Sequence, residues 1–158
     1  MASEWALTEV IDGAPLWTYI WCISSQFIVF PLVGHYCSVR TYKITFTILL
    51  LKDFLVGQLP TSLVLHHVFS ILIINTFCLR KLDVQMYTAA EFGSAFFNLV
   101  TLARYYNIFV TPIFIMYSVM ISLSNAYVLQ YIYHYRAATV WKVVPVSIIV
   151  GRQAFIYL

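Results

Sequence analysis

The chain has 158 residues, of which 62% are hydrophobic and 9% are charged, whereas a soluble domain carries about 25% charged residues. Nine Lys and Arg residues stand against six Asp and Glu residues, which gives a net charge of +3. The basic residues are scattered singly or in pairs, so they form no stripe that could bind nucleic acid. The composition therefore excludes a soluble enzyme and a nucleic-acid-binding protein, and predicts a small polytopic membrane protein.

Apolar segments follow one another along the chain, each close to the length of a transmembrane helix, about 20 residues. The five segments cover residues 16–37, 42–59, 61–79, 87–103 and 108–133. The connections between them are only a few residues long, so neighbouring helices should be antiparallel. We therefore predict an all-α fold, a transmembrane helical bundle of five spans.

The two ends of the chain differ in character. Residues 1–15 are acidic and hold no basic residue, so they do not resemble a cleavable presequence, and residues 16–158 should form a single transmembrane domain. Within residues 139–158, the apolar run between Lys142 and Arg152 rises about 12 Å as a helix, which is short for a hydrocarbon core about 30 Å thick. We expect a sixth short span or an interfacial helix there, and we expect other membrane protein subunits to contact this apolar C-terminal segment.

Basic residues in the loops predict the orientation in the membrane. Arg104 is the only basic residue in the short loops of one side. The loops of the other side hold Arg40, Lys43, Arg80, Lys81 and Arg136. By the positive-inside rule, the N-terminus should lie on the lumenal, or trans, side.

The cysteines and the outlying histidines give no sign of a cofactor. Cys22, Cys37 and Cys78 lie in or beside apolar segments without CxxC spacing, and we interpret them as small apolar core residues. His35 and His134 fall at the ends of predicted spans, where interfacial positions explain them better than haem ligation does. We expect no metal and no cofactor.

Ionisable residues inside the predicted spans are the candidate functional residues, because each costs about 2.5–3.5 kcal/mol on insertion. They are Lys52, Asp53, His66, His67 and Glu91. The other charges should lie in loops.

Asp53 and His67 should lie at one level. They stand seven residues before and after Pro60, where the chain is expected to turn, and seven helical residues rise about 10 Å. A carboxylate beside an imidazole fixes the tautomer of the ring, as a proton relay, an acyl acceptor or a metal ligand requires. The alternative interpretation is a polar clamp between two helices, in which a hydrogen bond contributes about 0.6 kcal/mol.

A second polar group lies on the fourth predicted span. Glu91, Ser94, Asn98 and Thr101 have the spacing of one helix face, and small residues around them would let a neighbouring helix approach closely. Lys52 has a long stem and could reach Glu91. The alternative is a purely structural role, either for a buried pair of Lys52 and Glu91 or for a protonated Glu91 that only packs between helices.

The order of these features resembles the TLC-domain family, which includes translocating-chain-associated membrane proteins and ceramide synthases. The matching runs are KD at 52–53, LHHVF at 65–69 and AEFGSAFFNL at 90–99, and the resemblance covers about residues 45–135. It implies an all-helical bundle around a lipid-accessible cavity in the endoplasmic reticulum; the mitochondrial inner membrane is the alternative location. By the same resemblance, the cavity would be lined by Asp53, His66, His67, Glu91 and Asn98.

Two functions follow from this resemblance. In ceramide synthases, the paired histidines and a downstream His-Asp motif serve acyl transfer, whereas this chain has no His-Asp dipeptide. We therefore expect a non-catalytic membrane protein that binds membrane lipid, or serves as a small accessory subunit of a larger membrane protein complex. The alternative is a lipid acyltransferase or acyl hydrolase in which His66 or His67 acts as general base or acyl acceptor, oriented by Asp53.

Overall fold

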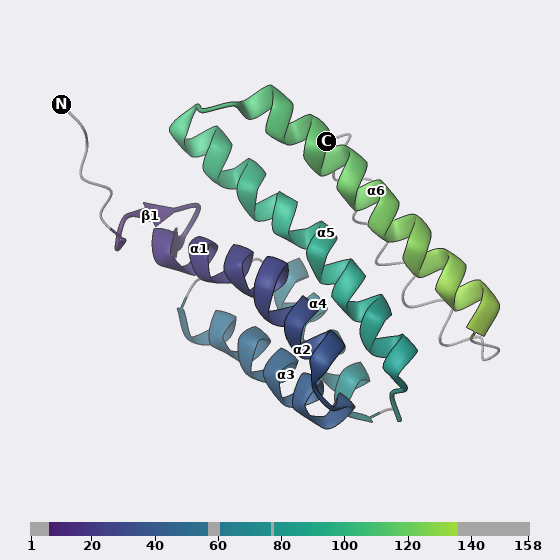
Figure 1. The fold of residues 1–158 in the computed structure, drawn as a ribbon. Coiled ribbons are helices and arrows are strands. Elements are labelled where there is room, and N and C mark those ends of the chain that lie inside the picture. The colour runs from purple at the N-terminus through teal and green to yellow at the C-terminus, as the bar shows by residue number, and fades with distance from the viewer. Residues whose placement is uncertain (1–6, 57–60, 77, 136–158) are drawn as a thin grey trace. The chain divides into compact units, whose positions relative to one another are not determined.

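The computed structural model describes residues 7–56, 61–76 and 78–135, and this part of the chain is mostly helical (Figure 1). A short hairpin, β1 (Val10–Ile11) and β2 (Ala14–Pro15), precedes the helices. The helical elements are α1 (Leu16–Ser24), η1 (Ser25–Val29), α2 (Phe30–Tyr36), α3 (Val39–Val56), α4 (Thr61–Thr76), α5 (Lys81–Tyr106) and α6 (Val110–Tyr135). The chain forms two compact units: unit 1 is Met1–Lys81 and unit 2 is Leu82–Leu158.

The predicted helical character is confirmed, and the helices fall on the five predicted apolar segments. The fourth helix differs, because α5 begins at Lys81 instead of near residue 87. Asp83 therefore lies in the first helical turn, where a carboxylate interacts favourably with the helix dipole. The possible sixth helix at 139–158 lies outside the described residues.

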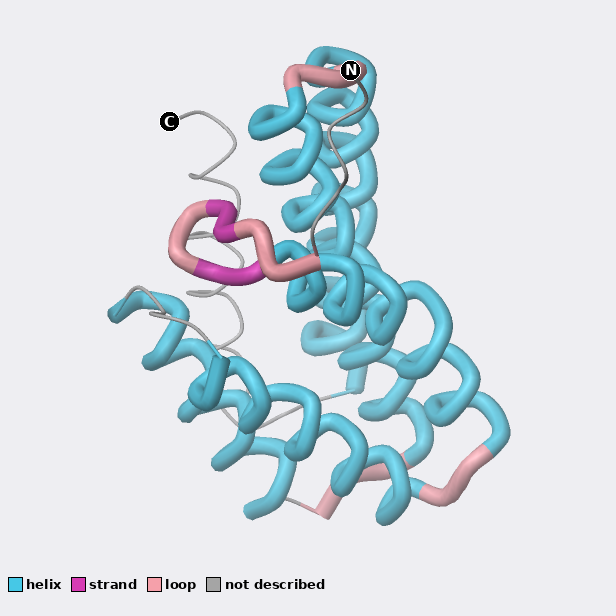
Figure 2. Tube along the Cα trace, turned by 90° about the vertical axis from the view of Figure 1, so that its left-hand side faces the viewer, coloured by secondary structure: helices cyan, strands magenta, loops and turns pink. Residues whose placement is uncertain are grey.

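Unit 1 begins with the hairpin, which Figure 2 shows in magenta. Its two-residue turn consists of Asp12 and Gly13, with φ angles of 46° and 83°, the combination that a type I′ turn needs and that Asp-Gly favours. The backbone N–H of Leu16 donates to the carbonyl of Glu9 at 2.7 Å, and the side chain of Ile11 is fully buried. The part of the N-terminal segment that the structure describes, from Leu7 onward, is thus folded onto the start of α1.

A widened turn interrupts the first helical run, Leu16–Tyr36. In η1, the N–H of Phe30 donates to the carbonyl of Ser25, five residues back. Pro31 follows directly, and in a regular α-helix its ring would clash with the carbonyl four residues earlier. The π-helical turn accommodates the proline without ending the run.

Aromatic packing joins α2 to α3 in unit 1. The rings of Phe30, Tyr42 and Phe46 are almost completely buried, with centroids 5.3–5.9 Å apart, the range of favourable ring pairs. Ser38 caps α3, since its Oγ accepts from the backbone N–H of Thr41 at 3.1 Å. In turn, α3 packs on α4.

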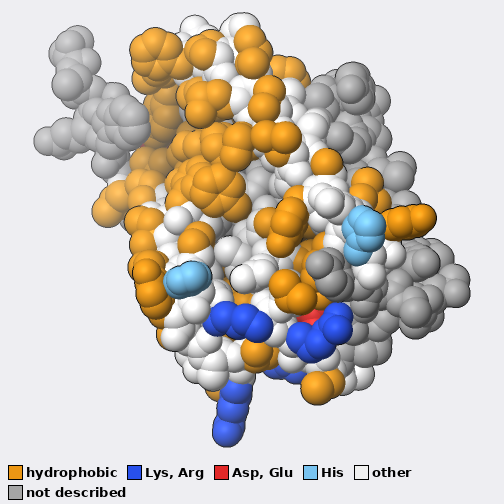
Figure 3. Space-filling model, turned by 45° about the vertical axis from the view of Figure 1, so that its right-hand side comes forward, with side chains coloured by type: hydrophobic (Ala, Val, Ile, Leu, Met, Phe, Trp, Pro, Cys, Tyr) orange, Lys and Arg blue, Asp and Glu red, His pale blue; other side chains and the backbone are white. Residues whose placement is uncertain are grey.

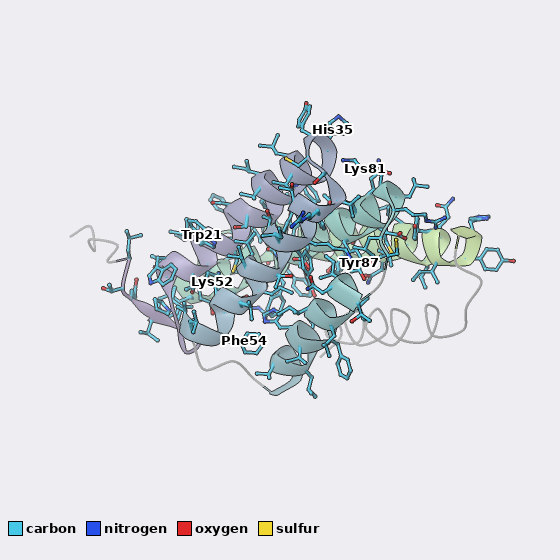
Figure 4. All side chains as sticks on the ribbon, turned by 90° about the horizontal axis from the view of Figure 1, so that it is seen from below. Trp21, His35, Lys52, Phe54, Lys81 and Tyr87 are labelled. Carbon is cyan, nitrogen blue, oxygen red and sulfur yellow. The ribbon has the colours of Figure 1, made fainter. Side chains whose placement is uncertain are left out.

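Lys81 binds the C-terminal end of α2, and Figure 4 shows it near His35. Its Nζ donates to the carbonyls of His35 at 2.9 Å and Cys37 at 3.0 Å. These carbonyls belong to the C-terminal end of α2, where a cation is favoured.

The described part of unit 2 is a pair of antiparallel helices, α5 and α6, which run side by side in Figure 1. Asn107 ends α5 with a φ of 54°, and two hydrogen bonds form a Schellman motif: Ile108 N–H to Ala103 O, and Asn107 N–H to Arg104 O. The core between the helices consists of Met86, Val128, Tyr131 and Ile132, with Tyr87 and Ala90 packed against it.

Two helical stretches of the described chain are long and apolar enough to cross a membrane, Leu16–Tyr36 and Val110–His134. Only 22% and 28% of their most apolar windows are buried, whereas the core helix of a soluble protein is mostly buried. Hydrophobic side chains also spread over much of the face shown in Figure 3. These features are compatible with association with a membrane.

The other helices do not meet the same criteria. α4 has 16 residues, and α3 carries four charged residues, two of them Lys52 and Asp53. α5 is long, but Gln85, Glu91 and Asn98 make its sequence less apolar. The polar residues that drew attention in the sequence thus also reduce the apolar character of the helices that carry them.

Candidate functional site

Asp53 joins two of the predicted site residues within unit 1. Its Oδ1 lies 2.8 Å from Nζ of Lys52, the preceding residue of α3. Its Oδ2 lies 3.7 Å from Nε2 of His67 on α4, an electrostatic contact slightly longer than a hydrogen bond. All three side chains are less than one-fifth exposed. The packing of α3 on α4 therefore brings Asp53 and His67 to one level.

Cys22 of α1 belongs to the same group of side chains. Its Sγ accepts from Nζ of Lys52 at 3.3 Å and lies 3.9 Å from Oδ1 of Asp53. We call Cys22, Lys52, Asp53 and His67 the polar cluster; Figure 4 labels its Lys52. The cluster draws on α1, α3 and α4 and so connects three of the helices of unit 1.

The interpretation of the cysteines as apolar core residues was wrong. Cys37 and Cys78 are exposed, Cys22 is partly buried, and no cysteine of the described chain forms a disulfide. A signal for Cys22 was present in the sequence. It stands about two turns into its helix and Asp53 about one turn before the end of the antiparallel α3, so their levels are similar.

The two histidines take different positions, as residues about 100° apart on a helix must. His67 faces Asp53, and the ring of His66 lies 5.7 Å from the ring of His67. His67 is 6% exposed, and within the described chain its Nδ1 has no hydrogen-bond partner. A neutral ring that directs Nε2–H toward Asp53 would leave Nδ1 as an acceptor.

An apolar groove of about 300 Å³ lies on α3 and α4 beside the polar cluster. It is lined by Leu51, Phe54, Val68, Ile71 and Leu72. Phe54 connects the two features, because it lines the groove and its ring also meets the ring of His67 at 5.8 Å, edge to face. The groove offers apolar contacts that suit a hydrocarbon chain.

The second predicted group lies on α5, in unit 2. Ser94 donates to the carbonyl of Ala90 at 3.1 Å, and Thr101 to that of Phe97 at 3.2 Å, so both hydroxyls bond within their own helix. Glu91 and Asn98 are partly buried on the same helix. Lys52 belongs to unit 1 and Glu91 to unit 2, and a pair between them stays a prediction.

A buried acid in unit 2 was not predicted. We expected Asp83 in a loop, but it is 1% exposed at the start of α5, and the hydroxyl of Tyr131 donates to its carboxylate. The sequence held a signal for this position, because Val128, Tyr131 and Ile132 have the spacing of one face of α6, and all three are buried.

Asn125 on α6 is a second unexpected polar residue. It is 2% exposed, and neither its Oδ1 nor its Nδ2 has a hydrogen-bond partner in the described chain. The neighbouring Ser124 differs, because its Oγ donates to the carbonyl of Ala89 on α5 at 2.8 Å. This bond shows a close approach of α6 to the small residues of α5.

Within the described residues, no three His, Cys, Asp or Glu side chains gather in a way that could hold a metal ion. In comparisons with known proteins, no protein-family model, no curated protein sequence and no solved structure matches the chain. The chemistry of the site is therefore argued from the geometry alone.

Proposed function

We propose that this chain is a polytopic integral membrane protein of the TLC type, with five spans. It binds membrane lipid and serves, without catalysis, as an accessory subunit of a larger membrane protein complex. Two helical stretches of spanning length and an exposed apolar surface support membrane insertion. The orientation would be that of the loop charges, with the N-terminus on the trans side of the endoplasmic reticulum or mitochondrial inner membrane.

Lipid binding rests on one observation, the apolar groove beside the polar cluster. A lipid combines a hydrocarbon chain with a polar head, and Phe54 lies between an apolar surface and His67. An acyl chain in the groove would contact Leu51, Ile71 and Leu72. The head could then accept a hydrogen bond from Lys52, the one cation of the polar cluster.

A non-catalytic role agrees with the contacts of the cluster. The ammonium of Lys52 is paired with Asp53 at 2.8 Å, and Asp53 also faces His67. Such mutual neutralisation stabilises contacts between helices. The sequence also lacks the His-Asp dipeptide that serves acyl transfer in ceramide synthases.

Photolabelling tests lipid binding directly. The full chain is reconstituted in lipid nanodiscs that contain a phospholipid with a diazirine at the end of its acyl chain, and the labelled peptides are mapped by mass spectrometry. We expect enriched labelling of the groove residues Phe54, Val68 and Leu72, and loss of that enrichment in Leu72→Trp, which fills the groove. Leu123→Trp, at an exposed site on α6, is the matched control. Uniform labelling of all exposed apolar residues would contradict specific lipid binding.

Native electrophoresis in mild detergent tests the subunit role. A tagged chain extracted from its own membranes should migrate in a high-mass complex, and purification should bring the same partner proteins each time. Migration as a stable monomer would contradict the subunit role, while leaving the lipid-binding result unaffected.

The second candidate function is a lipid acyltransferase or acyl hydrolase. It is favoured by His67, whose Nδ1 is buried without a hydrogen-bond partner in the described chain while Nε2 faces Asp53. His67→Ala and His66→Ala should then abolish lipid turnover and preserve thermal stability in detergent. Loss of stability without any measurable turnover in the unaltered chain would reject catalysis.

A further inference from the structure

The thiol of Cys22 and the amine of Lys52 are in contact across two helices. Nζ of Lys52 lies 3.3 Å from Sγ of Cys22, and Oδ1 of Asp53 lies 2.8 Å from the same Nζ and 3.9 Å from the same Sγ. A nucleophilic sulfur, an amine and a proton acceptor thus meet at one point. The cysteine stands in a group of reactive side chains, which is where site-selective oxidation occurs.

We propose that Cys22 and Lys52 are the site of an oxidative cross-link, a nitrogen–oxygen–sulfur bridge that covalently joins α1 to α3. The oxidant is dioxygen, which is apolar and dissolves in hydrocarbon. This inference is independent of the proposed function, because it requires neither a lipid nor a partner subunit.

The reaction balances with one molecule of dioxygen. Asp53 first takes a proton from the ammonium and leaves a neutral amine. One N–H bond, the S–H bond and the O–O bond break, while an N–O bond and an O–S bond form, and the two hydrogens leave with the second oxygen atom as water. Sulfur and nitrogen each lose two electrons, and dioxygen gains four. A dithiol in excess reduces the bridge back to the thiol and the amine, as it reduces the early products of cysteine oxidation. Two dithiols supply the four electrons, and the bridging oxygen leaves as water.

The surroundings favour this bridge over full oxidation of the sulfur. Lys52 carries a flexible four-carbon stem, so Nζ can adjust to hold one oxygen atom between itself and Sγ. Nε2 of His67 faces the carboxylate that accepts the proton. An imidazole that carries its hydrogen on Nδ1 can receive the proton from Asp53 at Nε2. Once formed, the bridge fixes α1 against α3 and removes the positive charge of Lys52.

Mass spectrometry of the full chain in mild detergent tests the proposal. After incubation in air-saturated buffer, we expect a species that has gained one oxygen atom and lost two hydrogen atoms, and that returns to the starting mass with dithiothreitol. Peptide mapping should find a segment with Cys22 linked to a segment with Lys52. This change in mass should disappear in Cys22→Ser and in Lys52→Arg. It should persist in Cys78→Ser, which removes an exposed thiol.

The linked peptides of the unaltered chain keep the test valid even if a variant fails to fold. An unchanged mass in air would overturn the proposal, as would sulfinic or sulfonic acid alone at Cys22. A linked pair without the additional oxygen atom would also overturn it, because that product is a direct sulfur–nitrogen bond. A gain that persists in Lys52→Arg would show that the amine takes no part.

Discussion

The carboxylate of Asp53 lies between the ammonium of Lys52 at 2.8 Å and the imidazole of His67 at 3.7 Å, and the contact with His67 joins α3 to α4. The ammonium of Lys52 depends on the negative charge of this carboxylate. If Asp53 were neutral, the amine of Lys52 would remain in an environment where less than one-fifth of its side chain meets solvent. The stability of unit 1 should therefore respond to this one charge more than to any exposed charge.

Asp53→Asn should lower the free energy of unfolding by about 2 kcal/mol, because it leaves the partly buried Lys52 without its counter-charge. The measurement is thermal unfolding in mild detergent, followed by circular dichroism. Asp12→Asn is the matched control, since Asp12 is exposed and asparagine also adopts the positive φ angle found there.

Equal unfolding midpoints for the two variants would mean that Asp53 contributes no electrostatic stabilisation. The double variant Lys52→Met with Asp53→Asn should recover part of the loss, because it removes the unpaired cation along with its partner.

Tyr131→Phe should destabilise unit 2 by about 1–3 kcal/mol, because it deprives the carboxylate of Asp83 of a hydroxyl donor. Asp83 is 1% exposed, so water cannot readily replace that donor. Hydrogen exchange of the α5 and α6 amides would measure the effect. Tyr133→Phe, which alters a tyrosine that is 78% exposed, should leave exchange unchanged, and equal exchange in the two variants would contradict a stabilising role for the bond.

Gly13→Ala should open the N-terminal hairpin, because a side chain at a φ of 83° costs about 1–2 kcal/mol. The amides of Leu16 and Trp17 donate to the carbonyls of Glu9 and Leu7, so their hydrogen exchange reports on this segment. We expect faster exchange at both amides and no change within α3. Exchange at these two amides as slow as in the unaltered chain would show that the hairpin tolerates the added methyl group.

The fold of this chain could be predicted from the sequence as far as periodicity and length determine it. The apolar segments marked the helices, and counting residues from Pro60 placed Asp53 and His67 at one level. Both results depend only on the rise of a helix and on short connections. The run Leu16–Tyr36 and α3 are also joined by a short connection, so the same count places Cys22 near the level of Lys52. The contact was missed because Cys22 was interpreted as an apolar core residue and not as a partner for a polar side chain.

Local chemistry explains the other differences. An Asp-Gly pair is a strong turn signal, but the segment around it was interpreted through its acidic composition, and the hairpin was overlooked. Asp83 was assigned to a loop because it is charged. A tyrosine hydroxyl from the facing helix gives it a partner instead, and α5 begins two residues before it.

Asn125→Leu should raise the unfolding temperature in mild detergent, which is the opposite of the usual effect of a core substitution. The amide of Asn125 is buried and has no hydrogen-bond partner in the described chain, so replacing it with an apolar group of similar size removes an unmet desolvation cost of about 1–3 kcal/mol. Asn75→Leu is the contrast at an exposed site, because Asn75 donates to Thr47 Oγ1 and to the carbonyl of Ile71, both at 2.8 Å. That variant should lose stability. If Asn125→Leu were instead the less stable of the two, the buried amide would contribute to stability and the prediction would be wrong.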